Sequence, residues 1–113
     1  MTIEEASKQY EIPDYIREEY ERLGLRGKTR DKAGSWECDR YDLEYLGLMV
    51  TLHQIGFERA DVKTYMNLVF RGKCTKAERL KMLNRKRDKA MESIHFCEGQ
   101  IDLLDYLRYE LEK

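Results

Sequence analysis

The chain has 113 residues, of which 42% are hydrophobic and 38% are charged, so it is too rich in hydrophobic residues to be disordered and fits one small domain with a helical extension. Its 21 Lys and Arg residues nearly balance 22 Asp and Glu residues, and the net charge of −1 provides no overall attraction to nucleic acid or to an anionic membrane. No hydrophobic run approaches the roughly 18 residues of a membrane span, so we expect no membrane partner. Three cysteines without CxxC spacing are typical of reduced thiols, which predicts a cytoplasmic location.

The first stretch predicts two short helices joined by a tight turn. Thr2 and Glu5 have the spacing of a capping box, and the helix they begin extends to about residue 9. Pro13 suits the opening position of a second helix, which ends near residue 23 because Gly24 supplies a stop. This arrangement is typical of a helix-turn-helix motif, but many helical hairpins that bind no DNA have the same spacing.

A loop with two glycines follows over residues 25–38. Such a segment predicts either a small hairpin whose basic side chains contact DNA phosphates or a solvated surface loop. Its basic residues are Arg26, Lys28, Arg30 and Lys32, and it also holds the one tryptophan, Trp36.

Two further helices are predicted before residue 72. Asp39 and Asp42 have the spacing of a helix start, and Gly56 ends that helix. The hydrophobic faces of the two helices comprise Leu43, Leu46, Met49, Val50 and Leu52, and then Val62, Tyr65, Met66 and Val69.

The last 39 residues predict one long helix, with Thr75 and Glu78 as its capping box. Hydrophobic residues recur at alternating steps of three and four, which is a heptad pattern. A helix of this length extends roughly 55–60 Å, so we predict that it pairs with a second copy; an amphipathic helix that covers its own domain is the alternative. The predicted dimerisation residues are Leu80, Leu83, Ala90, Ile94, Cys97, Ile101, Leu104 and Leu111.

Several stretches, in order and spacing, resemble the MerR-type transcriptional regulators. The opening TIEEASKQYEIP resembles the family's first helix and turn, and YERLGL resembles the close of its recognition helix. Gly34, the DLxxLxxM pattern from Asp42 and the segment LHQIGF resemble the wing and the third helix. ERLKML and LLDYLRYE resemble the dimerisation helix, so the resemblance covers nearly the whole chain.

The resemblance implies a mainly α fold, with a winged helix-turn-helix domain and two accessory helices in residues 1–72. Residues 73–113 would form the dimerisation helix, which pairs antiparallel with its twin. Members of this family bind promoter DNA as dimers and distort its spacer. We therefore expect a homodimeric DNA-binding regulator of transcription, whose backbone contacts come from Arg17, Arg26, Lys28, Arg30, Lys32 and Trp36.

The expected DNA-contacting positions depart from the family pattern. The segment from Arg17 to Glu21 reads Arg-Glu-Glu-Tyr-Glu where the family usually has Leu-Arg-Tyr-Tyr-Glu. Residues 1–40 hold eight Lys and Arg residues against ten Asp and Glu residues, which weakens the attraction to phosphate unless the cations cluster on one face. The alternative is an interaction module that has lost DNA binding and presents Glu18, Glu19 and Glu21 to a basic protein partner.

No pattern in the chain calls for catalysis or a cofactor. Cys74 lies where metal-sensing members of the resembled family keep a thiolate, but His53 and His95 have no ligand spacing to it. No nucleophile with its base, phosphate-binding glycine loop or carboxylate pair is recognisable. We therefore expect no enzyme activity, no cofactor and no metal site.

Overall fold

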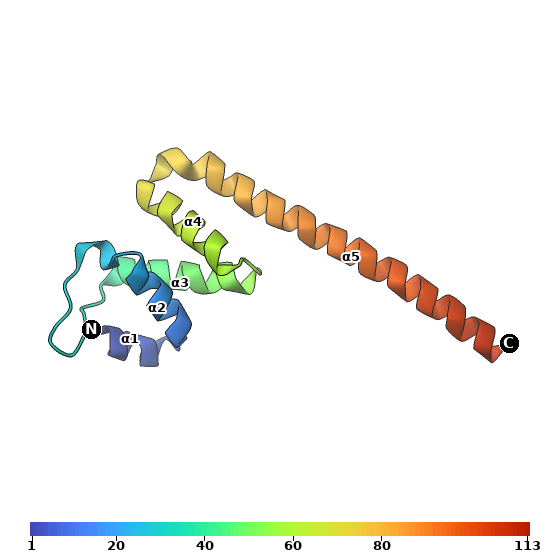
Figure 1. Ribbon diagram of the computed structural model, residues 1–113, viewed down its shortest axis with the longest axis horizontal. Helices are drawn as coiled ribbons and strands as arrows, with labels where there is room; N and C mark the ends of the chain where they lie inside the picture. Colours follow the sequence, from blue (N-terminus) through green and yellow to red (C-terminus); the bar gives the residue numbers. More distant parts are fainter. The chain divides into compact units, whose positions relative to one another are not determined.

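The computed structural model describes residues 1–113, apart from the side chain of Leu25. It is mainly helical, as predicted, and it ends in one long helix (Figure 1). The chain divides into two compact units, Met1–Lys73 and Cys74–Lys113. The elements are α1 (Ile3–Gln9), α2 (Asp14–Arg22), η1 (Leu25–Gly27), α3 (Arg40–Gln54), α4 (Arg59–Arg71), η2 (Lys73–Thr75) and α5 (Lys76–Glu112), where η marks a single 3₁₀ turn.

The first unit is built around α3, which packs against both α2 and α4. Burial of large side chains from each of these helices removes hydrophobic surface from water, which is the main favourable contribution to the folding of so small a unit. The predicted hydrophobic faces are largely confirmed, and the buried hydrophobic residues include Ile3, Ala6, Ile16, Tyr20, Trp36, Leu46, Met49, Leu52, Val62, Tyr65, Met66 and Leu68.

The helix ends follow the local signals in the sequence. The Thr2 hydroxyl accepts a hydrogen bond from the Glu5 amide at 3.3 Å, as its capping spacing predicts. Asp39 and Asp42 form a complete capping box, with side-chain to amide distances of 2.9 and 3.0 Å. Gly24 adopts a φ of 99° directly after the last turn of α2, a backbone conformation that favours glycine. Pro13 lies one position earlier than predicted, as the N-cap of α2 rather than its first residue.

The loop between α2 and α3 is not a regular hairpin in the part of the chain that the structure describes. Its returning half pairs instead with the N-terminus: the Ile3 amide donates to the Trp36 carbonyl at 3.0 Å, and the Cys38 amide donates to the Met1 carbonyl at 2.8 Å. An isolated antiparallel bridge joins Thr2 to Glu37. These bonds occupy backbone groups that a hairpin partner would need. The two halves of the loop are joined by backbone hydrogen bonds at the tip, where the Asp31 amide donates to the Ser35 carbonyl at 2.7 Å.

The second unit is α5, which has 37 residues and is therefore about 55 Å long. The predicted capping box at its start is wrong. Thr75 has a φ of −96° and a ψ of 5° because the 3₁₀ turn η2 leads directly into α5, and its side chain does not cap the helix. Its hydroxyl accepts a hydrogen bond from Arg79 Nε at 3.2 Å instead.

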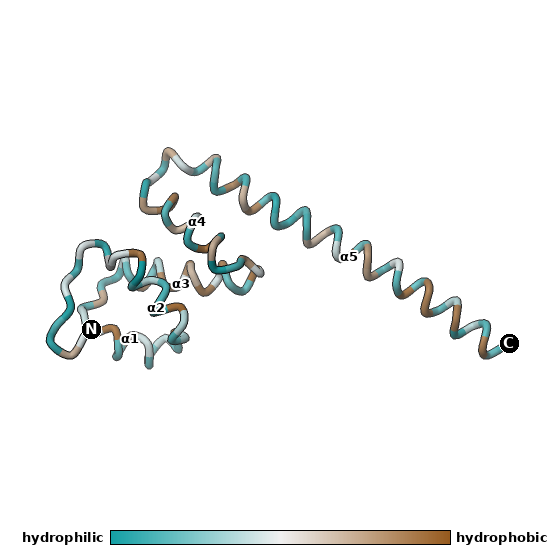
Figure 2. The backbone as a smooth tube through the Cα atoms, viewed as in Figure 1, coloured by the Kyte–Doolittle hydropathy of each residue, from teal (hydrophilic) through white to brown (hydrophobic). Residues whose placement is uncertain are grey.

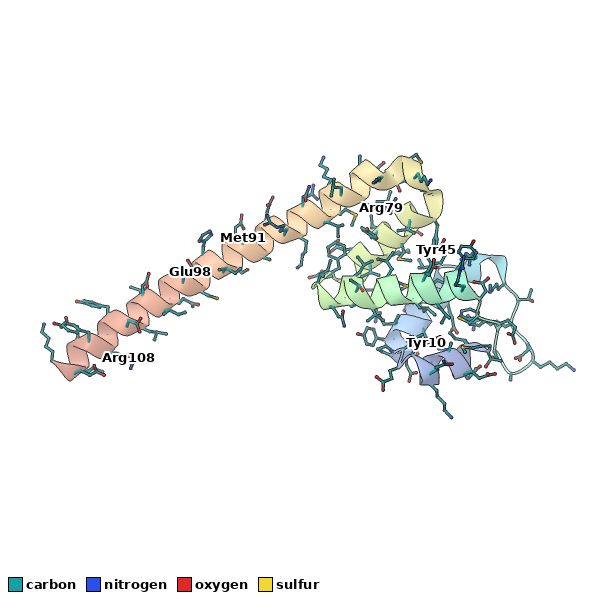
Figure 3. The ribbon with its side chains drawn as sticks, turned by 180° about the vertical axis from the view of Figure 1, so that it is seen from behind. Tyr10, Tyr45, Arg79, Met91, Glu98 and Arg108 are labelled. Carbon is teal, nitrogen blue, oxygen red and sulfur yellow. The ribbon has the colours of Figure 1, made fainter. Side chains whose placement is uncertain are left out.

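Hydrophobic residues recur along the whole length of α5 (Figure 2). Within this chain α5 buries none of its residues, and its side chains project all around it, including the labelled Met91, Glu98 and Arg108 (Figure 3). Ile94, Ile101 and Leu104 of the predicted dimer seam are more than half exposed. Separately, none of the described helices is both long enough and hydrophobic enough to cross a membrane.

Candidate nucleic-acid interface

Helix α2, the second helix of the expected helix-turn-helix motif, turns one of its carboxylates inward. Glu19 is 7% exposed, and its Oε2 lies 2.6 Å from Nε2 of His53 on α3. Arg59 on α4 donates from Nε to Glu19 Oε1 at 3.0 Å. This single side chain therefore joins three helices, and it does not reach the outer surface of α2.

Glu21 is also engaged within the domain. Its Oε1 accepts a hydrogen bond from Trp36 Nε1 at 3.0 Å and another from Arg17 Nε at 3.2 Å. Arg30 lies 3.4 Å from Oε2 of the same carboxylate. Glu21 thereby holds the loop against α2, while Glu18 stays exposed together with Tyr15 and Arg22.

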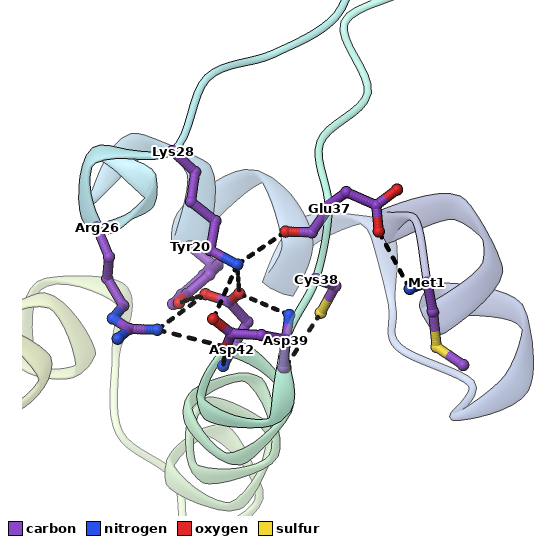
Figure 4. A network of polar contacts seen from close by, with 8 residues as sticks. All are labelled: Met1, Tyr20, Arg26, Lys28, Glu37, Cys38, Asp39 and Asp42. Carbon is purple, nitrogen blue, oxygen red and sulfur yellow. Dashed lines mark hydrogen bonds and ion pairs between the residues drawn. The ribbon is translucent and has the colours of Figure 1, made fainter.

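The base of the loop is held by the fully buried Asp42 at the start of α3 (Figure 4). Tyr20 donates its hydroxyl proton to Asp42 Oδ1 at 2.5 Å, and Arg26 Nη1 lies 3.4 Å from the same oxygen. Lys28 pairs with Asp42 Oδ2, lies 3.1 Å from Asp39 Oδ2 and donates to the Glu37 carbonyl at 2.8 Å. Two cations thus compensate a carboxylate that would be costly to bury alone.

These surroundings change the acidity of the groups in the network. Burial, together with the hydrogen bond to Asp42, raises the pKa of Tyr20. Burial raises the pKa of the Cys38 thiol to about 11, with a further contribution from the charge of Asp42. The backbone hydrogen bond from Asp42 and the pairing with Lys28 lower the pKa of Asp39, so this carboxyl stays ionised under all ordinary conditions.

The six residues expected to contact DNA therefore have different environments. Arg17, Arg26, Lys28 and Arg30 all pair with carboxylates of the same domain. Trp36 is 3% exposed and packs beside Tyr20, with 5.9 Å between ring centroids. Lys32 is exposed and has no ion-pair partner among the described residues. The cations Arg26, Lys28 and Arg30 thus hold the loop in place, and Lys32 projects from it.

Sequence reasoning missed the roles of Glu19, Asp42 and Tyr20. The capping spacing of Asp39 and Asp42 was recognisable, but the cations that approach Asp42 come from positions 14 and 16 residues earlier. It also missed a depression between α2, α3 and α4 in which Arg22, Arg59 and Lys63 gather. For the described residues, no group of three or more His, Cys, Asp or Glu side chains is arranged to hold a metal ion.

The chain was compared with protein families, curated proteins and solved structures. No protein-family model matches the chain, and neither does any curated protein. Among solved structures it is similar to HiNmlR, "a MerR family regulator lacking the sensor domain, bound to promoter DNA", with 26% identity over 89% of this chain and 81% of that chain and a TM-score of 0.61.

Two further solved structures agree in fold. A putative MerR family transcriptional regulator from Listeria monocytogenes has 26% identity, covers 94% of this chain and 81% of its own, and has a TM-score of 0.67. A MerR family regulator from Bacillus thuringiensis has 20% identity over 93% of both chains, with a TM-score of 0.62. The chain is therefore a structural relative of the MerR family transcriptional regulators, whose fold it shares over most of its length.

Proposed function

We propose that this protein is a homodimeric regulator of transcription that binds duplex DNA through the exposed face of α2 and the tip of the following loop. The observation that carries the proposal is the inward orientation of Glu19 and the engagement of Glu21. Of the three acids of α2 that the alternative would present to a basic protein partner, Glu19 and Glu21 are already paired within the domain. Glu18 is then the one of the three that duplex DNA would meet.

The same observation weakens the alternative of an acidic interaction module. A basic protein partner would need several exposed carboxylates on α2, but Glu19 is buried and Glu21 is shared by Arg17, Arg30 and Trp36. The similarity to HiNmlR, a regulator that was solved on promoter DNA, also favours DNA as the partner.

The outer face of α2 offers a mixed set of contacts. Arg22 supplies a positive charge for a phosphate, and Glu18 is suited to accept a hydrogen bond from a cytosine amino group in the major groove. Lys32 at the loop adds a second exposed cation, which has no ion-pair partner among the residues that the structure describes. With so few free cations, the expected binding is weak on random DNA and depends strongly on base contacts.

The charge distribution of α5 supports antiparallel pairing. Residues 76–92 carry seven Lys and Arg residues against three acids, and residues 93–112 carry five acids against one Arg. In a single helix this distribution opposes the macrodipole, because positive charge gathers at the N-terminal half and negative charge at the C-terminal half. Antiparallel pairing brings each basic half beside the acidic half of its partner, whereas parallel pairing would bring like charges together.

The hydrophobic seam fits the same arrangement. In the antiparallel pair, facing residues have numbers that sum to 191, so Ile94 faces the partner's Cys97 and Leu80 faces the partner's Leu111. Arg87 and Arg108 also lie on the seam, where their stems can cover hydrophobic surface while their charged ends reach water. A dimer joined in this way carries two DNA-binding units and would bind two half-sites. Binding at two half-sites is the geometry needed to distort the DNA between them.

The proposal is tested by fluorescence anisotropy with the duplex that flanks the gene itself, titrated over a range of salt concentrations. We expect saturable binding whose log K falls linearly with log salt, and a scrambled duplex bound more weakly. Lys32→Ala should weaken binding to both duplexes and reduce the salt slope by about one unit per subunit, whereas the control Lys113→Ala should change neither. Glu18→Arg should tighten binding to the scrambled duplex. A dimer that binds neither duplex at low salt would overturn the proposal and favour the protein-interaction module.

A further inference from the structure

The depression between α2, α3 and α4 has a volume of about 230 Å³ and combines a positive rim with a hydrophobic base. The rim is formed by Arg22 of α2 and by Arg59 and Lys63 of α4, and the base by Leu23, Met49 and Val62. Met49 and Val62 are each 1% exposed, so the base is part of the packed core and does not depend on mobile surface side chains.

The rim carries more positive charge than the domain itself compensates. Glu19 also lines the depression, but its two oxygens are occupied by Arg59 and by His53. Arg22 and Lys63 have no ion-pair partner within the described part of the chain. Three cations against one carboxylate leave the depression with a formal charge of +2. A group that is bound there must therefore be an anion.

The hydrophobic base restricts the kind of anion. A backbone phosphate of DNA or an inorganic phosphate would satisfy the cations but leave the partly exposed side chain of Leu23 in contact with water. The volume is also below the roughly 300–1,000 Å³ of pockets that hold drug-sized ligands, so the occupant is small. An anionic group joined to one ring or to a branched aliphatic group fits both the charge and the size.

We propose that this depression is a binding site for a small organic anion. A carboxylate or phosphate is held between Arg22 and Lys63, while the attached hydrophobic group packs on Leu23, directly above the core residues Met49 and Val62. Glu19 fixes the Arg59 guanidinium at the side of the site and so acts as a positioning residue. The site belongs to the first unit alone and needs neither DNA nor a second copy of the chain.

The experiment uses phenyl phosphate and benzoate as probes, with inorganic phosphate for comparison, and records amide and Met49 methyl NMR shifts of the full chain without DNA. We expect saturable shifts at Arg22, Met49, Val62 and Lys63, with phenyl phosphate bound about tenfold more tightly than inorganic phosphate because of its ring. Lys63→Glu should weaken phenyl phosphate binding at least about tenfold. The matched control Lys8→Glu, which changes an exposed lysine on α1, should not weaken it.

Three outcomes overturn the inference: no saturable shift with either organic probe, equal affinity for phenyl and inorganic phosphate, or equal effects of Lys63→Glu and Lys8→Glu. The fold of each variant is checked by its unshifted amide spectrum, so a loss of binding is not mistaken for unfolding. Because DNA is absent from the titration, its result is independent of the DNA-binding test above. A protein that binds DNA but neither organic probe would refute this inference alone.

Discussion

His53 Nε2 lies 2.6 Å from Glu19 Oε2, so the carboxylate at the centre of α2 is bound to the neighbouring helix and is not presented to a partner. Arg59 completes the pairing from α4. The acid that stands where MerR-type proteins usually have tyrosine is thus a structural link between α2, α3 and α4.

Glu19→Gln should lower the free energy of unfolding by about 1–3 kcal/mol, because it removes the charge that matches Arg59 and leaves His53 with a poorer partner. The control Glu18→Gln, at the exposed neighbouring position, should change it by no more than about 0.5 kcal/mol. Urea unfolding followed by circular dichroism measures both. For the same reason Glu19→Tyr, although it restores the usual family residue, should destabilise the domain. Equal stability of the two Gln variants would show that Glu19 is not held inward in solution.

Asp42→Ala should lower the free energy of unfolding by about 3–5 kcal/mol, more than any other single change in the first unit. It leaves Lys28 and Arg26 without their buried partner, removes the acceptor of the Tyr20 hydroxyl and breaks the capping box of α3. Glu44→Ala, on the same helix but with its side chain 63% exposed, is the matched control and should be nearly neutral. Thermal unfolding of the two variants compares them directly, and similar melting temperatures would contradict the role of the network.

Ile94→Asp should convert the proposed dimer into monomers, since it buries an unpaired carboxylate beside the two-fold axis. His95→Asp changes an adjacent exposed residue that lies outside the seam, and it should leave the dimer intact. Sedimentation velocity at micromolar concentration distinguishes the two states. A dimer that persists in Ile94→Asp would mean that the chain pairs through another surface.

The reactivity of the three thiols should report the same pairing. Cys38 is buried, and its pKa of about 11 is two units above the ordinary thiol value of 9.0. Its thiolate fraction at pH 8 is therefore reduced about 100-fold. Because the thiolate is the reactive form, Cys38 should react slowly in every folded form of the protein. In the proposed dimer Cys97 would face the partner's Ile94, so a disulfide reagent should modify Cys74 first. In Ile94→Asp, Cys97 should react as well. Rapid modification of Cys97 in the unaltered dimer would contradict the seam.

Gly99→Ala should stabilise α5 by about 1 kcal/mol, because glycine has the greater backbone freedom to lose in a helix interior. An added Cβ at this position meets open space, and the residue has no positive φ. Gly24→Ala is the opposite control: there too the Cβ meets open space, but the φ of 99° strains any other residue, so this change should destabilise the protein. Melting temperatures that move in the same direction would show that one of the two backbone conformations is wrong.

The elements of this protein could be predicted from the sequence because their signals are local. The capping pairs Thr2 with Glu5 and Asp39 with Asp42, and the stops at Gly24 and Gly56, depend on residues a few positions apart. The heptad spacing of α5 is likewise a property of one segment. Thr75 is the exception, since its capping spacing was overridden by the 3₁₀ turn before it.

Only the tertiary structure decided which charges are free. Arg26 and Lys28 lie on a loop that looked solvent-exposed, and they reach the buried Asp42 only because α3 packs against α2. Glu19 looked like a barrier to DNA, and its carboxylate is engaged by residues 34 and 40 positions later in the chain. Net charge counts every ionisable group alike, whereas the charge that a partner meets depends on pairing between segments distant in sequence. That pairing is set by packing, and no local pattern encodes it.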